Sequence, residues 1–389
     1  MLKFFIAGYY GLGNIGDEAI LSGIIQSLNK NFDDIKITTL TNNKKFTEEY
    51  HKISGVEHSF KKRKKTFFKN QLFKGEFLKI CKEINRSDVF ILGGGELLQD
   101  IKFYYLPSLF SLLKYAQIRR KKTVIYGIGA GPIETNFGKK LANKVLKNVD
   151  LITVRDKKSK IALEKCGLGN VIQTADPAFS IKLPSKVELI SNNKIFPEND
   201  FFSATLHNKL YYDDIYRKND GLSIDLNKRR FSFSKLYNDI TSTFDKKLLF
   251  LPTVQSDVDG FLKLQENIKE DNSAIMQYNE KLNPFLANLQ SSELLIGMKL
   301  HSLIFATLLG KPFVPIAYSS KVESFIDSLD LNEISLNVED VDNLNFNEKV
   351  LNNIEIVMND NSLSKTLIKK SNILKEKSLE NAALIKNIL

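Results

Sequence analysis

Residues 3–29 read KFFIAGYYGLGNIGDEAILSGIIQSLN, a strand, a glycine loop and a helix in succession. The apolar run Lys3–Ala7 has the length of a buried strand, and apolar residues recur at helical spacing over Glu18–Asn29. The same alternation continues to residue 180, with strands expected at 36–40, 89–92, 123–126, 151–154 and 171–173 and helices at 106–119, 139–147 and 158–165. Such alternation is typical of βαβ units, so the sequence predicts an α/β fold around a parallel sheet.

A second alternating region begins at Phe201. Before it, residues 181–200 contain two prolines and an asparagine pair, a composition typical of a linker. Strands are expected at 202–206, 247–251, 293–296 and 313–316, with helices at 232–244, 260–268 and 302–309. The 389 residues are enough for two domains. We therefore predict two doubly wound domains facing a cleft. The predicted segments are an α/β domain over 1–180, a linker over 181–200, an α/β domain over 201–342 and a helical tail over 343–389.

The composition argues against several classes of protein. No apolar run approaches the roughly 18–20 residues of a membrane span, and the first residues lack the pattern of a secretion signal. Only Cys81 and Cys166 occur, without a CxxC pair, which argues against a disulfide scaffold and a zinc site. We expect a protein of the reducing cytoplasm without a metal.

Positive charge is concentrated between Lys61 and Lys82. This stretch holds nine of the 56 lysines and arginines and a single acid, in a chain of net charge +11. No nucleic-acid-binding motif accompanies the charge, so a nucleic-acid partner is not expected. Apolar residues recur within the stretch at helical spacing. The pattern fits an amphipathic helix on an anionic membrane, and it equally fits a helix packed on the N-terminal sheet with its lysines in water.

The loop GLGNIG at residues 11–16 matches the GxGxxG pattern of dinucleotide-binding folds. The second strand, however, is followed by Thr41–Lys45, which lacks the acidic residue that hydrogen-bonds the ribose of NAD. NADP therefore remains as the dinucleotide alternative. Asp17 and Glu18 follow the loop and offset the positive end of the expected helix. We therefore favour a site for sugar hydroxyls, or a proton acceptor, over a phosphate cradle; a plain tight turn is the structural alternative.

Further strands of the first domain end in glycines and charged residues. Three glycines occupy 93–95, followed by Glu96 and Asp100, and GIGAGP occupies 127–132. Both loops are expected at the carboxyl edge of the sheet, where open α/β sheets bind ligands. Arg155–Asp156 ends another strand, and a loop ion pair or a helix cap is its structural alternative.

In the second domain the sharpest motif is GMKLHS at residues 297–302. It joins an apolar strand to an apolar helix, which brings Lys299 and His301 to the helix N-terminus. Free N–H groups, a lysine and a histidine together favour binding of an anion.

The order of the motifs resembles one known family. GYYGLGNIGDEAIL, GGGELLQD, GIGAGPI, VRD, ADPAF, LPTVQSDVD and GMKLHSLIFA follow one another as in polysaccharide pyruvyl transferases, over roughly Gly8 to Val322. The resemblance implies a two-domain fold similar to GT-B glycosyltransferases. It also implies transfer of pyruvate from phosphoenolpyruvate onto sugar hydroxyls as a ketal. Relatives often use lipid-linked acceptors, which would place the chain at the inner face of the membrane, with residues 61–82 as the contact.

The family's Arg-Leu-His segment, implicated in holding the donor phosphate, falls on Lys299, Leu300 and His301. Lysine keeps the charge but loses the bidentate fork of arginine. The chain also departs from the family at His207, where many relatives carry an arginine, and over Tyr318–Val322, which replaces a more acidic segment.

Ketal formation needs cations for the donor, an acid and a base. Phosphoenolpyruvate carries about −3 near neutral pH, for which Lys299, Arg155 and Lys321 are the candidate cations. His301 is the candidate acid, and Asp17, Glu18 or Asp100 is the candidate base. The candidate substrate-binding residues are Lys299, Leu300, Arg155, Lys321, Gly11, Gly13, Asn14, Gly16, Gly94, Gly95 and Glu96. No cofactor is expected beyond phosphoenolpyruvate as co-substrate.

Two other functions fit the same motifs. A GT-B-like glycosyltransferase would place the diphosphate of a nucleotide sugar at the same helix N-terminus. A sugar-binding protein without turnover would account for the lysine in place of the family's arginine.

Overall fold

The computed structural model describes residues 1–58, 75–100, 105–185, 195–197, 200–207, 226–269 and 271–389. The chain forms two compact units, one of Met1–Lys182 with Ile373–Leu389 and the other of Leu183–Asn372. Each unit is built on one parallel sheet, which confirms the predicted pair of doubly wound α/β domains.

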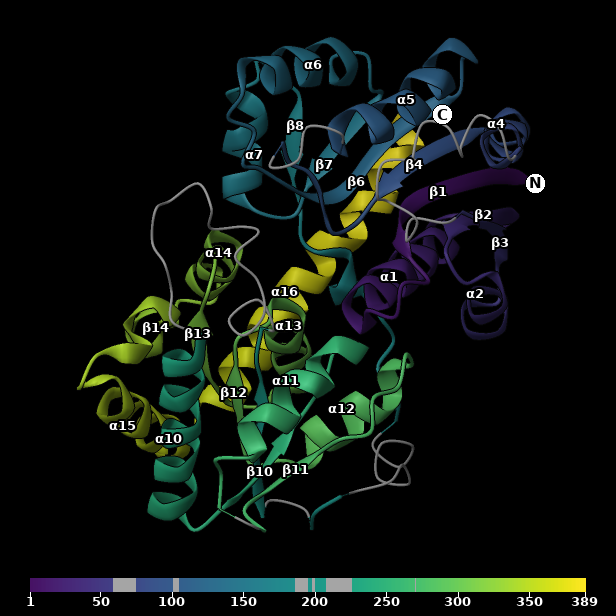
Figure 1. Ribbon diagram of the computed structural model, residues 1–389. Coiled ribbons are helices and arrows are strands. Elements are labelled where there is room, and N and C mark those ends of the chain that lie inside the picture. Colours follow the sequence, from purple (N-terminus) through teal and green to yellow (C-terminus); the bar gives the residue numbers. More distant parts are fainter. Residues whose placement is uncertain (59–74, 101–104, 186–194, 198–199, 208–225, 270) are drawn as a thin grey trace. The chain divides into compact units, whose positions relative to one another are not determined.

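The sheet of the first unit has the strand order β3-β2-β1-β4-β6-β7-β8 (Figure 1). Strand β5 pairs with β6. The strands are β1 (Leu2–Tyr10), β2 (Ile35–Thr41), β3 (Ser54–Glu57), β4 (Val89–Gly93), β5 (Glu96–Leu98), β6 (Lys122–Ala130), β7 (Leu151–Val154) and β8 (Val171–Gln173). The helices are α1 (Ile15–Asn31), α2 (Lys44–His51), α4 (Glu76–Arg86), α5 (Tyr105–Ile118), α6 (Asn136–Leu146), α7 (Lys157–Glu164) and the 3-10 turn η1 (Pro177–Ser180).

Side chains on alternate positions of β1 and β4 build the core of the first unit. Phe5 and Phe90 lie on one face, with ring centroids 6.0 Å apart, in a buried cluster with residues of α4, α5 and α6. The neighbouring Phe4 and Ile91, which point the other way along the strands, are equally buried. Both faces of the sheet are therefore covered, as the near-continuous apolar strands predict.

The sheet of the second unit has the order β11-β10-β9-β12-β13-β14. Its strands are β9 (Phe201–Thr205), β10 (Lys247–Phe250), β11 (Ser273–Ile275), β12 (Leu295–Gly297), β13 (Phe313–Ala317) and β14 (Leu336–Asn337). Its helices are α10 (Leu226–Phe244), α11 (Gln255–Gln265), α12 (Leu282–Ser291), α13 (Leu300–Leu309), α14 (Ser320–Ser328) and α15 (Phe346–Asn359), with 3-10 turns η3 (Asn332–Ile334) and η4 (Val338–Asp342).

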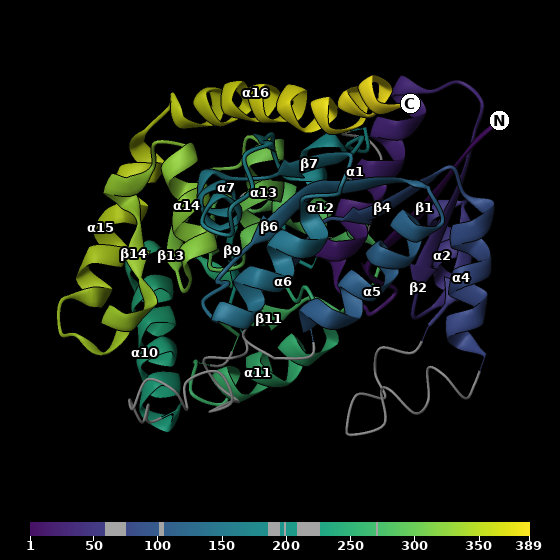
Figure 2. The same ribbon diagram turned by 90° about the horizontal axis from the view of Figure 1, so that it is seen from above.

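The last helix, α16 (Leu363–Ala383), is one continuous helix (Figure 2), and the division into units falls within it. It is followed by the turn η5 (Leu384–Ile388). Its last part is fixed to the first unit by Asn381, which is fully buried. The Asn381 side-chain oxygen accepts hydrogen bonds from the hydroxyls of Thr153 and Thr174, and its amide donates to the carbonyl of Ala175.

Each sheet contains a point where the order of its strands reverses. In the first unit β2 and β4 lie on opposite sides of β1, and in the second β10 and β12 lie on opposite sides of β9. Loops that leave the carboxyl ends of two strands at such a point diverge to opposite faces of the sheet and leave room for a ligand. The loops after β1, β4, β9 and β12 are therefore the first places to look for a site.

The predicted basic helix lies mostly outside the described residues, because residues 59–74 are not among them. The described part begins with Gly75, whose φ of +69° precedes the first turn of α4. From there Ile80 and Ile84 are fully buried in the first unit. Among the helices that the structure describes, none is long and apolar enough to cross a membrane.

Candidate functional site

The loop between β1 and α1 carries the GxGxxG residues. Gly11 and Gly13 have φ of +68° and +71°, values that glycine adopts without strain. The Asn14 side chain accepts a hydrogen bond from the N–H of Gly16 at 3.0 Å and caps α1. The loop is a tight turn with an N-cap, and its first helical turn carries Asp17 and Glu18.

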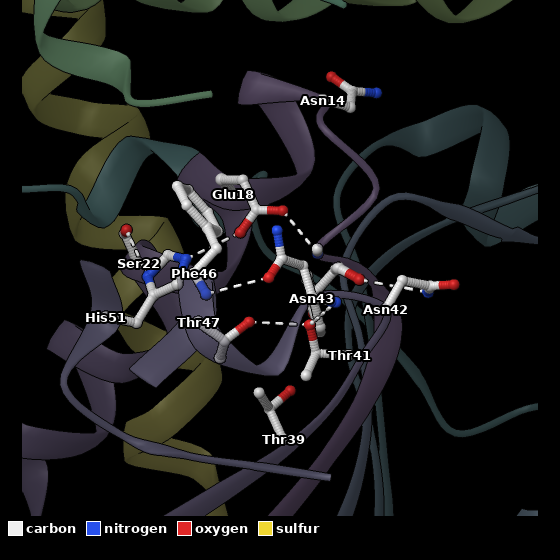
Figure 3. A network of polar contacts seen from close by, with 12 residues as sticks. Asn14, Glu18, Ser22, Thr39, Thr41, Asn42, Asn43, Phe46, Thr47 and His51 are labelled. Carbon is white, nitrogen blue, oxygen red and sulfur yellow. Dashed lines mark hydrogen bonds and ion pairs between the residues drawn. The ribbon is translucent and has the colours of Figure 1, made fainter. Parts of the chain in front are cut away.

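Glu18 is 1% exposed, and both of its oxygens are engaged (Figure 3). Oε1 accepts from the N–H of Gly11 at 2.7 Å, and Oε2 lies 2.8 Å from His51 Nε2. His51 ends α2, and its Nδ1 lies 3.2 Å from Ser22 Oγ. His51 could not be singled out from the sequence, because 33 residues separate it from Glu18.

Asp17 has a different environment from its neighbour. It is partly exposed, and a side chain built at Gly95 would come within 3.6 Å of its Oδ1. Successive residues of a helix point about 100° apart, so the first turn of α1 directs one carboxylate inward and the other toward the loop after β4. The structure thus brings Asp17 and Gly95 together and separates Asp17 from Glu18.

Gly94 and Gly95, which follow β4, have different roles in the packing of this loop. A Cβ at Gly94 would lie 1.9 Å from the Ile20 side chain, so this glycine lets α1 pack closely on the loop. Gly95 accepts a hydrogen bond from the N–H of Gly129 at 2.8 Å, which joins the loop after β4 to the last part of β6. Residues 127–130 were predicted as part of a loop, but they continue β6 and pair there with β5.

Asp100 follows β5 and fixes the loop before α6. Its carboxylate accepts from the N–H groups of Glu134 and Thr135 at 3.1 and 2.8 Å and from the Thr135 hydroxyl at 2.6 Å. Burial raises the pKa of Asp100, the hydrogen bonds lower it, and the net shift is downward from 3.8. A carboxylate stabilised in this way is a weak proton acceptor.

Arg155, at the end of β7, lies between two carboxylates. Its Nη1 is 3.1 Å from Asp176 and its Nε 3.3 Å from Asp156, and the side chain is 5% exposed. Burial lowers the pKa of the guanidinium, but the charges of Asp176, Asp156 and Glu96 raise it, and the net shift is upward. Asp156 also caps α7 through the N–H of Ser159 at 2.7 Å. Both structural alternatives considered for Arg155–Asp156, the ion pair and the cap, are present.

In the second unit Lys299 lies two residues after β12, at the N-cap of α13. Its Nζ is 2.6 Å from both carboxylate oxygens of Asp257 and donates to Thr253 Oγ1 at 2.8 Å. Asp257 itself accepts from the N–H groups of Thr253 and Val254 in the first turn of α11. The lysine is therefore held between the ends of β10 and β12. Asp257 belongs to the motif LPTVQSDVD, but nothing in that motif identifies it as the partner of Lys299.

The electrostatics of Lys299 balance three effects. Burial lowers the pKa of its ammonium, the Asp257 carboxylate raises it, and the charge of Lys321 lowers it again, with a net downward shift. Lys321, in the first turn of α14, also lies 5.8 Å above the centre of the Tyr318 ring. Two lysines thus lie close enough to influence each other at this edge of the sheet, and the Asp257 carboxylate compensates the charge of one of them.

His301 occupies the first turn of α13, as predicted, and Leu300 before it is buried. The start of this helix is fixed to β9 because the hydroxyls of Ser302 and Thr205 lie 2.7 Å apart. His207, which follows β9, packs its ring on Tyr318 at a centroid distance of 4.2 Å. Histidines therefore follow both central strands of the second sheet.

The fold and the loops at its strand reversals define a two-domain protein of GT-B-like architecture. The UDP-GlcNAc 2-epimerase of Methanocaldococcus jannaschii superposes with a TM-score of 0.61 at 15% identity, covering 96% of this chain and 99% of that one. The epimerase of Neisseria meningitidis, solved with UDP-GlcNAc, gives 0.60 at 12% identity, covering 100% and 99%. At these identities the likeness establishes the fold alone.

The family follows from the sequence comparison. The model of the polysaccharide pyruvyl transferase family matches residues 14–320, and the chain belongs to this family. The amylovoran biosynthesis protein AmsJ of Erwinia amylovora is 23% identical over 374 residues, which cover 87% of this chain and 88% of that protein. The resemblance inferred from the order of the motifs is confirmed.

Proposed function

We propose that this chain transfers a pyruvyl group from phosphoenolpyruvate to two hydroxyls of a sugar, in a polysaccharide or its lipid-linked precursor. The observation that carries the proposal is the cationic edge of the second sheet. There, Lys299 and His301 follow β12, and Lys321 lies near enough to depress the pKa of Lys299. A donor with a phosphate and a carboxylate matches this edge in charge.

The second unit is the donor side in this proposal. Lys299 and Lys321 bind the phosphate and carboxylate, and the free N–H groups of the first turn of α13 add partial positive charge. His301 lies in that same turn and donates the proton. Arg155, in the first unit, pairs with two carboxylates and its side chain is 5% exposed, whereas Lys299 pairs with one carboxylate and is 13% exposed, so the lysine is the stronger candidate for the donor.

The first unit supplies the base. His301 protonates the methylene carbon of phosphoenolpyruvate, and the first sugar hydroxyl adds to C2 as Asp17 takes its proton. The second hydroxyl then forms its bond to C2 as the bond from C2 to the phosphate oxygen breaks, and its proton leaves with the departing group as hydrogen phosphate. Asp17 is favoured as the base because Glu18 is buried in a hydrogen-bonded pair and Asp100 is stabilised in its ionised form.

The test is phosphate release from phosphoenolpyruvate with a panel of lipid-linked and nucleotide-linked sugars, with mass spectrometry of the sugar. Release of phosphate together with a sugar that gains one pyruvyl ketal supports the proposal. Release of a nucleotide from a nucleotide-sugar donor would instead indicate a glycosyltransferase. Binding of a glycan without turnover of either donor would indicate a sugar-binding protein.

A further inference from the structure

The pair of Glu18 and His51 is the most deeply buried charged contact beside the glycine loop. The two side chains are 1% and 2% exposed, and their nearest atoms lie 2.8 Å apart. Because a carboxylate only accepts, the proton of this hydrogen bond lies on His51 Nε2. Burial of such groups is costly unless they are fully paired, so the contact must stabilise a particular arrangement of the chain around it.

That arrangement is the path of the glycine loop. Glu18 Oε1 holds the N–H of Gly11 at 2.7 Å, and a Cβ at Gly11 would lie 2.2 Å from Thr41 Oγ1 and 2.6 Å from the backbone nitrogen of Asn43. The end of β2 therefore closes around the loop. The backbone N–H of Asn42 completes the junction by donating to the carbonyl of Tyr10 at 3.0 Å.

Helix α2 brings His51 to this junction. The helix begins where the Asn43 side chain accepts from the N–H of Phe46, and the Thr47 hydroxyl lies 2.8 Å from that of Thr41. At the other end, the His51 ring packs edge-on against Tyr50 and Phe46, with centroid distances of 4.8 and 6.2 Å. Figure 3 shows Glu18 pointing from α1 toward His51, whereas Asn14 points away from this network.

We propose that Glu18 and His51 form a positioning pair that sets the glycine loop and, through the first turn of α1, the direction of Asp17. This inference rests on the proposed function, because it assigns Asp17 the acceptor hydroxyl. Glu18 does not reach the substrate itself, since it is buried with both oxygens engaged. Its influence passes through Gly11 on one side and its sequence neighbour Asp17 on the other.

The experiment compares His51→Ala with His51→Gln, which keeps a donor for Glu18. The control is Glu49→Gln, on the exposed side of the same helix. Transfer is measured as phosphoenolpyruvate-dependent phosphate release with an acceptor from the panel above. We expect His51→Ala to lower kcat by up to about a hundredfold, the cost of a small misplacement of a catalytic group, with KM for phosphoenolpyruvate unchanged. His51→Gln should restore most of the loss, and the control should equal wild type.

A double-variant cycle separates positioning from general stability. In an Asp17→Asn background, His51→Ala should change the residual transfer by less than about twofold, because the group that it positions is already gone. If His51→Ala lowers transfer by the same factor in both backgrounds, or if His51→Gln fails to restore it, the positioning role is overturned.

Hydrogen–deuterium exchange gives a readout that does not depend on activity. In His51→Ala, the peptide covering residues 8–16 should exchange about tenfold faster, as expected for loss of a charge-assisted hydrogen bond, while peptides of α5 stay unchanged. Unchanged exchange of the loop would overturn the proposal. If wild type releases no phosphate while the loop still responds, the proposed function fails and the anchoring of the loop stands.

Discussion

Each of the two sheets has a point where the order of its strands reverses, and the two points share a topology. The side chains in the loops at these two points carry opposite charge. In the first unit, the loops after β1 and β4 present glycine backbone and the carboxylate of Asp17. In the second unit, the loops after β9 and β12 present His207, Lys299 and His301. Because the topology is shared, the difference teaches that side chains after the central strands decide what each unit handles. We assign hydroxyl groups to the first and the anionic donor to the second.

Each reversal also contains a buried carboxylate that holds a basic side chain. Glu18 holds His51, which is 2% exposed, whereas Asp257 holds Lys299, whose side chain is 13% exposed. The first pair is sealed within the fold, and the second keeps part of its cation in contact with water. This contrast supports a positioning role for the first pair and a binding role for Lys299.

The largest expected effect is that of His301→Ala. Loss of general acid catalysis should lower kcat by about 10²–10⁴-fold, with an unchanged melting temperature because His301 is partly exposed at the start of α13. The measurement is single-turnover phosphate release beside a thermal melt. An early melt with proportionate loss of activity would mark His301 as a packing residue.

Lys299→Ala should mainly destabilise the second unit, by about 3–5 kcal/mol, because it leaves the Asp257 carboxylate buried without its cation. Urea unfolding measures this change. The double variant Lys299→Met with Asp257→Asn removes both charges and should recover most of the stability, but it should not bind phosphoenolpyruvate. A double variant that binds the donor as wild type does would contradict the assignment of Lys299.

Asp17→Asn should affect the acceptor side alone. We expect kcat to fall by about a hundredfold while the Kd for phosphoenolpyruvate, measured by calorimetry, stays unchanged. The matched variant on the donor side is His301→Ala. Weaker binding of phosphoenolpyruvate by Asp17→Asn would contradict the assignment of the acceptor to the first unit and of the donor to the second.

The sequence predicted most of the longer elements and the loops that follow the central strands, but it did not predict the helices α2, α12 and α14. Long apolar strands followed by glycines or polar residues identify the carboxyl edges of the sheets. Several helices are recognised from the helical spacing of their apolar residues. The strands that were missed, β3, β5, β11 and β14, have only two to four residues, and all four lie at an edge of their sheet or off its main path. Such short segments carry too little periodicity to be recognised.

The partners across the fold could not be predicted. His51 reaches Glu18 over 33 residues and Asp257 reaches Lys299 over 42, and only the packing of α2 and α11 on their sheets brings them together. A weak signal exists for Asp257, because it follows a strand that ends at the same edge as Lys299. Asn381 has no such signal, since its contacts with Thr153 and Thr174 cross more than 200 residues.

Asn381→Ala should destabilise the first unit by about 1–3 kcal/mol, because two buried hydroxyls lose the nearer of their two acceptors. Asn361→Ala, in the exposed turn before α16, is the control. Hydrogen–deuterium exchange should become faster in the peptides of β7 and β8 and stay unchanged in the peptides of β12. Equal acceleration of both would show that the two units do not respond separately.

The smallest expected effect is that of Asp100→Asn, which distinguishes Asp100 from Asp17 as the base. Asp100 should contribute about 0.5 kcal/mol or less, because its hydrogen-bonded carboxylate is partly exposed and screened by solvent. Its pKa in the folded protein is below 3.8, so its contribution is present above that pH and is lost as the pH falls through the folded value. Urea unfolding should therefore show a small difference between wild type and variant at pH 7 that shrinks below pH 3.8.

Transfer by Asp100→Asn should stay within about twofold of wild type, since the role of Asp100 is to hold the N–H groups of Glu134 and Thr135. A loss of transfer as large as that of Asp17→Asn, with stability unchanged, would move the base from α1 to the loop after β5.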